Sequence, residues 1–151
     1  MQYVVEVFLK DKFRDKHGEH VKHDIAEFGI PNVDSVKFHP LYRINSELKS
    51  AQIEKIASAL LIDPITEDYK VSKTPSKSKN SVDIEVWLKK GVTDPVADSV
   101  VKAVKDLGIN KSITVKTGSK FILSGKVSKK AAEEVALKML ANPMIQNFTI
   151  R

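Results

Sequence analysis

The chain contains no cysteine among its 151 residues, which excludes disulfides, thiolate metal sites and a cysteine nucleophile. It also lacks any apolar run near the roughly 20 residues that a membrane-spanning helix needs. Residues 1–6 enter a strand pattern directly, without the basic region and apolar stretch of a signal peptide. Together these absences predict a cytoplasmic protein.

The net charge of +6 is unevenly distributed along the chain. Residues 1–71 carry 10 basic and 12 acidic groups, a net −2, whereas residues 82–151 carry 12 basic and 7 acidic groups, a net +5. A basic second half suits an acidic partner or a nucleic acid. The alternative is that these lysines only keep the surface soluble.

A shift of 79 positions aligns the chain with itself without a gap. The shift places Glu6–Lys10 on Glu85–Lys89 and matches apolar residues, a glycine and a proline over the full length. The matched single positions are Asp15 with Asp94, Val21 with Val100, Gly29 with Gly108, Val36 with Val115, Leu61 with Leu140 and Pro64 with Pro143. Repetition at a fixed period indicates one small unit built twice.

Each repeat reads as strand, helix, strand, strand, helix, strand. In the second repeat, Asp94 is expected to cap a helix that begins at Pro95, and Gly108 to end it in a left-handed conformation. Gly118-Ser119 reads as a turn between two short strands. The expected elements are strands at 2–10, 33–38, 42–48, 66–71, 82–89, 112–117, 120–124 and 145–150, and helices at 15–28, 50–62, 94–107 and 128–141.

This order predicts an α+β fold of two tandem ferredoxin-like (βαββαβ) units, each an antiparallel sheet with helices on one face. The two units would form a pseudo-two-fold pair. The other sheet face is uncovered within one unit, and Phe8 and Trp87 should point there because neighbouring strand residues alternate between faces. A large aromatic on an uncovered face indicates a packing surface.

Residues 72–81 contain no apolar residue and are rich in serine and lysine, so they read as a linker. The predicted organisation is therefore a divergent first repeat at 1–71, a linker at 72–81 and a second repeat at 82–151. A tether of this length would hold the two units at a high mutual concentration.

No catalytic, cofactor-binding or metal-binding constellation emerges from the sequence. His17, His20 and His23 fan over about 120° of helix surface, so they cannot converge on one ion. Residues 118–126 have six residues between their glycines, whereas a phosphate loop has four. No serine has a plausible triad and no carboxylate pair is identifiable.

The ferredoxin-like order also occurs in RNA-binding modules, which carry a Lys/Arg-Gly-aromatic pattern on the third strand. The third strands here offer Leu41, Tyr42 and Phe121 without that pattern, which disfavours nucleic acid. A tandem ferredoxin-like protein that senses a ligand or binds nucleic acid remains the alternative function.

Three stretches of the second repeat resemble PurS, the small subunit of phosphoribosylformylglycinamidine (FGAM) synthase. They are 88–97 (LKKGVTDPVA), 115–120 (VKTGSK) and 140–150 (LANPMIQNFTI). The first repeat resembles the family less, although its ending at 60–71 keeps the pattern. The usual family member is a single unit, so the duplication departs from the family.

The resemblance implies a scaffold without chemistry of its own in purine biosynthesis. In that family the small subunit pairs with itself and bridges the glutaminase PurQ and the synthase PurL, so that ammonia passes between them. The complex, an ATP-dependent glutamine amidotransferase, uses ATP, Mg and glutamine, and this chain would bind none of them itself. Further self-association beyond the internal pair stays open.

Five residues are the candidates for contacts with these partners. They are Trp87, Lys116, Lys120, Asn142 and Pro143. Trp87 is the aromatic of the uncovered face, whereas the other four belong to the family-like stretches. Helix termination alone is the alternative explanation for Asn142-Pro143, because proline disfavours helical geometry in the residue before it.

Overall fold

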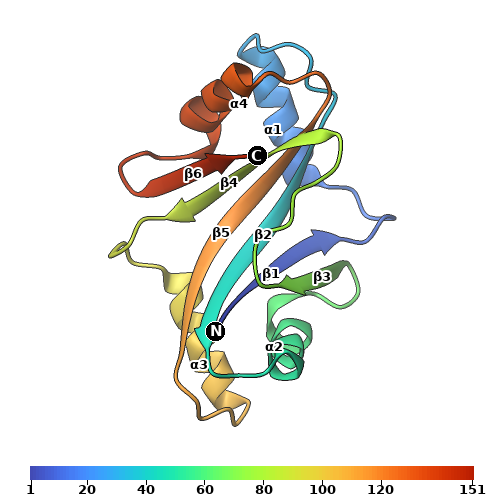
Figure 1. Cartoon of the computed structure of the whole chain (residues 1–151). Helices are drawn as coiled ribbons and strands as arrows, with labels where there is room; N and C mark the ends of the chain where they lie inside the picture. The colour runs from blue at the N-terminus through green and yellow to red at the C-terminus, as the bar shows by residue number, and fades with distance from the viewer. The chain divides into compact units, whose positions relative to one another are not determined.

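The computed structural model describes all residues, 1–151. Each repeat forms a strand, a helix, a long strand, a helix that ends in a π-helical turn, and a last strand (Figure 1). The first repeat comprises β1 (Gln2–Leu9), α1 (Lys16–Glu27), β2 (Ser35–Ser46), α2 (Ser50–Ile56), η1 (Ala57–Leu61) and β3 (Glu67–Ser72). The second comprises β4 (Ser81–Leu88), α3 (Pro95–Asp106), β5 (Ile113–Ser124), α4 (Lys129–Val135), η2 (Ala136–Leu140) and β6 (Gln146–Ile150).

The predicted helix ends of the second repeat are confirmed. The Asp94 carboxylate accepts a hydrogen bond from Ala97 N at 3.0 Å, which caps α3, and Pro95 is the first helical residue. Gly108 follows α3 with φ of 87°, in the left-handed region that an L side chain rarely adopts. Local signals therefore located these ends correctly.

The predicted turn at Gly118-Ser119 is wrong, because both residues lie inside the continuous strand β5. The two strands expected at 33–38 and 42–48 are likewise one strand, β2. A tight two-residue hairpin needs a positive φ, and Gly118 is not among the glycines that have one. Each long strand instead pairs with the other, since β2 and β5 are hydrogen-bonded neighbours.

The strand order is β3-β1-β2-β5-β4-β6. β1 pairs antiparallel with both β2 and β3, and β4 pairs antiparallel with β6. β3 and β6, the last strands of the two repeats, are the edges. The antiparallel α+β architecture predicted from the repeat is confirmed.

The chain folds into two compact units that each take segments from both repeats. Unit 1 comprises Met1–Phe13, Pro40–Ser76 and Thr93–Gly118. Its core joins β1 and α2 of the first repeat to α3 of the second. The buried residues of this core are Tyr3, Val5, Val7, Ile44, Leu48, Ile53, Ile56, Ala57, Leu61, Ala97, Val100, Val104, Ile113 and Val115.

Unit 2 comprises Arg14–His39, Lys77–Val92 and Ser119–Arg151. Here α1 of the first repeat packs with β4, β5 and α4 of the second (Figure 1). The core residues are Val21, Ile25, Ile30, Val36, Ile84, Val86, Phe121, Leu123, Ala132, Val135 and Ala136. The repeats thus exchange their first helices, and the compact units and the sequence repeats divide the chain differently.

Candidate functional site

The Ser/Lys segment 72–81 is hydrogen-bonded to the sheet in both units, so it is more than a free tether. In unit 1 the Ser76 hydroxyl donates to Glu6 Oε1 at 3.1 Å. In unit 2 the Ser78 amide donates to Asp83 Oδ2 at 2.7 Å. Glu6 alternates with the core residues Val5 and Val7, so this segment lies on the sheet face opposite the helices.

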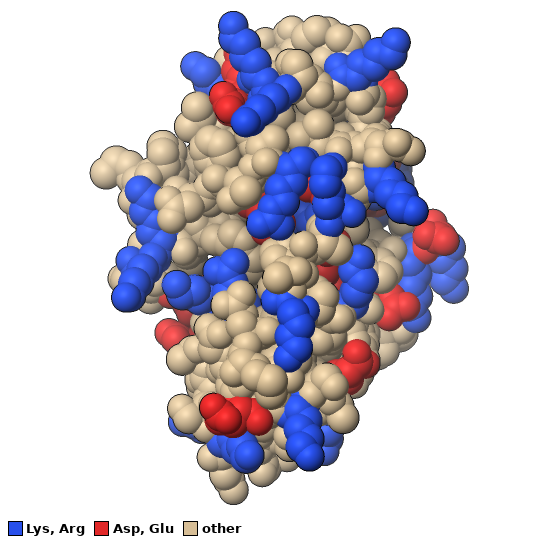
Figure 2. Space-filling model, in the orientation of Figure 1, with Lys and Arg blue, Asp and Glu red and all other residues tan.

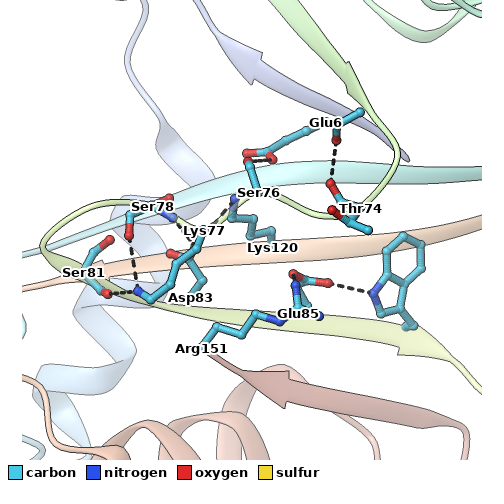
Figure 3. A network of polar contacts seen from close by, with 12 residues as sticks. Glu6, Thr74, Ser76, Lys77, Ser78, Ser81, Asp83, Glu85, Lys120 and Arg151 are labelled. Carbon is cyan, nitrogen blue, oxygen red and sulfur yellow. Dashed lines mark hydrogen bonds and ion pairs between the residues drawn. The ribbon is translucent and has the colours of Figure 1, made fainter. Parts of the chain in front are cut away.

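A buried cluster of charged side chains lies beneath this segment in unit 2 (Figure 3). Asp83, Glu85 and Lys120 are respectively 0%, 2% and 1% exposed. Lys120 Nζ lies 3.6 Å from Asp83 Oδ2, and Arg151 Nη1 lies 3.0 Å from Glu85 Oε2. Each buried carboxylate therefore has a cationic partner, as burial of a charge requires.

Trp87 is buried within the chain. Trp87 points to the predicted face, but it is only 8% exposed, and its indole Nε1 donates to Glu85 Oε1 at 3.2 Å. It is thus part of the buried cluster and offers almost no surface to a partner. The packing surface predicted at this position is therefore occupied within the chain, and contact of Trp87 with a partner subunit stays a prediction.

The other candidate residues are spread over both units. Lys120 is buried in its ion pair, whereas Lys116, four residues earlier on the same strand, is exposed and belongs to unit 1. Asn142 and Pro143 are exposed in unit 2. The structure therefore brings Trp87 and Lys120 into one buried cluster and leaves the other three on the surface.

The Asn142-Pro143 corner is a closely hydrogen-bonded loop between η2 and β6. The side-chain oxygen Oδ1 of Asn142 accepts a hydrogen bond from Met144 N at 3.1 Å, and the main-chain N–H of Asn142 donates to Gln146 Oε1 at 2.7 Å. The Asn142 carbonyl accepts from the amides of both Ile145 and Gln146. These bonds involve main-chain groups beyond the helix end, so helix termination alone does not describe the corner.

The capping aspartates have a second role that the sequence reading missed. Asp94 Oδ2 accepts from both the amide and the hydroxyl of Thr117 at 2.9 Å, within unit 1. Asp15, its equivalent in unit 2, caps Gly18 and accepts from Phe38 N at 2.8 Å. Each aspartate thus fixes a helix start to a long strand. The only available signal was its recurrence at the 79-residue period.

One tyrosine near this contact has a shifted pKa. Burial raises the pKa of the Tyr42 phenol above its ordinary value, and the nearby carboxylates Glu67 and Asp94 raise it further. Both causes disfavour the phenolate. Tyr42 is therefore neutral at physiological pH, and it packs against the core of unit 1.

The histidines and the aromatic residues of the long strands have local partners. The His17 ring stacks on Phe38 with 4.0 Å between centroids, while His20 and His23 lie beside Asp24 and Glu27 on the same helix. The chain has no group of three or more His, Asp or Glu residues positioned to hold a metal ion. Phe121 is 5% exposed, so it is not presented for stacking on a base.

Lysine and arginine side chains are spread over the face shown in Figure 2 and cover more of it than aspartate and glutamate do. They do not line a single groove on this face. No helix has the length and apolar character required to cross a bilayer.

Comparison with known proteins identifies both repeats. The family model described as "PurS: Phosphoribosylformylglycinamidine (FGAM) synthase" matches residues 2–75 and again residues 81–151. The chain is also similar to phosphoribosylformylglycinamidine synthase subunit PurS of Archaeoglobus fulgidus, with 33% identity over 73 residues. That match covers 45% of this chain and 91% of the relative. The chain therefore belongs to the PurS family, and carries the family's unit twice in tandem.

Proposed function

We propose that this chain is a non-catalytic scaffold subunit of FGAM synthase in purine biosynthesis, bridging the glutaminase PurQ and the synthase PurL for ammonia transfer. The observation that carries the proposal is the double match to the PurS family, over residues 2–75 and 81–151. One chain would then supply what two identical subunits supply in a self-paired member of the family.

The chemistry of the buried cluster supports a structural role. Its carboxylates are occupied by Lys120, Arg151 and the Trp87 indole, all within the same unit. A general base or acid must be able to reach a substrate, and Asp83 and Glu85 are almost completely buried. ATP, Mg and glutamine would accordingly bind to the partner subunits and not to this chain.

The exchanged helices support the replacement of a homodimer. In unit 1 the buried face of α3 completes a core begun by β1 and α2, and in unit 2 α1 does the same for β4 and α4. Two separate single-repeat chains would have to exchange these helices as a dimer. The covalent connection makes the same exchange intramolecular.

Reconstitution with the purified cognate PurL and PurQ tests the proposal. With glutamine and Mg-ADP present, we expect the three proteins to elute together from a sizing column, and PurL and PurQ not to do so without this chain. Glutamine-dependent FGAM formation should require the chain, whereas formation from added ammonia should depend on it much less. Separate elution of all three proteins under these conditions would refute the proposal.

A further inference from the structure

Two equivalent corners carry the two most exposed large apolar side chains of the protein. Ile65, between η1 and β3 in unit 1, is 73% exposed, and Met144, between η2 and β6 in unit 2, is 83% exposed. The 79-residue shift superimposes them. We name residues 63–68 the first corner and residues 142–147 the second corner. An exposed apolar side chain at the same position of both loops does not contribute to core packing, and exposed apolar surface of this kind can mark an interaction site.

Both corners are held by the same set of hydrogen bonds. In the first corner Asp63 Oδ1 accepts from Ile65 N at 2.9 Å, and the Asp63 amide donates to Glu67 Oε1 at 2.8 Å. The second corner makes the equivalent bonds with Asn142 and Gln146. The neighbouring strands add Lys10 N to Thr66 O at 2.9 Å and Lys89 N to Ile145 O at 2.8 Å. The exposed side chains thus project from preorganised loops, which lowers the entropy cost of burying them in a partner.

The corners share a shape but differ in charge. Every acidic residue of the first corner is replaced by the corresponding amide in the second. The pairs are Asp63 with Asn142, Glu67 with Gln146 and Asp68 with Asn147. The bonds that form the corner use side-chain oxygens as acceptors, and an amide oxygen accepts as a carboxylate does. The three negative charges are therefore not needed to form the loop.

Resting on the proposed function, we infer that the two corners are docking points for two different subunits of the synthase complex. Each apolar tip inserts into an apolar socket on its partner. The socket for the first corner carries basic side chains that match its carboxylates, and the socket for the second corner does not. An apolar side chain that fills a pocket at the centre of an interface can serve as its anchor, and methionine is enriched at interfaces. A charge difference on a common shape is a means of choosing between partners.

Glutamine substitutions at the two tips test the docking role in the full-length chain. The variants are Ile65→Gln and Met144→Gln, and Leu137→Gln is the matched control, because Leu137 is 51% exposed but lies outside both corners. The Kd for purified PurL and for purified PurQ is measured separately by calorimetry. We expect each tip variant to weaken binding of a different subunit tenfold or more, and the control to stay within twofold of the unsubstituted chain.

A charge variant tests the selectivity. The triple variant Asp63→Asn, Glu67→Gln, Asp68→Asn gives the first corner the amides of the second and keeps its acceptor oxygens. We expect it to weaken binding of the same subunit that Ile65→Gln affects, and to reduce the salt dependence of that Kd. Circular dichroism and Tm verify that all variants are folded.

The outcomes separate this inference from the proposed function. If, with glutamine and Mg-ADP present, the unsubstituted chain fails to bind either one of the two subunits, the proposed bridging function fails. If the unsubstituted chain binds both subunits, but the Kd of either tip variant stays within twofold of the unsubstituted value for each subunit, the docking role is refuted. Loss of the same subunit by both tip variants, or an unchanged salt dependence in the triple variant, refutes the assignment of one partner to each corner.

Discussion

Replacing Lys120 by leucine should strongly destabilise the protein, because Lys120 is one partner of a buried ion pair. Lys120 is 1% exposed and forms an ion pair with Asp83, which is fully buried. The substitution leaves the Asp83 carboxylate with the Ser78 amide as its remaining donor among the bonds described above. Removing one partner of a buried pair costs about 3–5 kcal/mol, because a buried charge is left uncompensated.

The first repeat supplies the rescue for this variant. At the positions equivalent to Asp83 and Lys120 it has Val4 and Leu41, both fully buried. Apolar replacement of a whole buried ion pair is often neutral or stabilising. We therefore expect the free energy of unfolding of the double variant Asp83→Val, Lys120→Leu to be within about 1 kcal/mol of that of the unsubstituted protein, or higher.

Urea unfolding at pH 7, followed by circular dichroism, measures these differences. For a chain of this size about 3–5 kcal/mol corresponds to a decrease in Tm of roughly 6–20 °C. Lys116→Leu, at the exposed lysine on the same strand, is the control and should change the free energy of unfolding by about 0.5 kcal/mol or less. If Lys120→Leu costs the same in the Asp83→Val background as in the unsubstituted chain, the pair has no coupling and the reasoning is refuted.

Three further predictions concern packing, capping and pH. Gly18→Ala should lower the free energy of unfolding by about 2 kcal/mol or more in urea titrations, because its Cβ would lie 2.2 Å from Val36 O. Asp94→Ala should lower the free energy of unfolding by about 1–2 kcal/mol in the same assay, and Asp94→Asn should lower it by less, because the asparagine oxygen can still cap the helix. The raised pKa of Tyr42 makes it contribute stability below pH 10 that is lost as the pH rises above that value. Tyr42→Phe should flatten this loss, whereas an unchanged profile would contradict it.

The sequence predicted well what depends on local chemistry. Asp94, Pro95 and Gly108 mark the ends of α3 because capping and left-handed geometry are set by single residues. The repeat itself predicted the antiparallel fold, since the period aligned two complete sets of elements. The corner at Asn142 was also identified from its own residues.

What the sequence did not predict depends on contacts between distant residues. The apolar stripe of Val100 and Val104 on α3 would suit the sheet of either repeat, and nothing local shows that it packs in the core of β1. Gly118 has turn chemistry, yet pairing of β5 with β2 keeps it extended. Trp87 was expected to mark a packing surface, but its sequence position did not show that the indole packs within the chain, beside Glu85.

The exchange of first helices has a consequence for synthesis on the ribosome. The core of unit 1 begins at Tyr3 but includes Ile113 and Val115, and the core of unit 2 extends from Val21 to Ala136. Neither core can close until most of the chain has been translated. Such widely separated contacts slow folding. During translation the first repeat therefore keeps part of its apolar surface uncovered until the second repeat has been made. Chaperones can bind that surface during this interval.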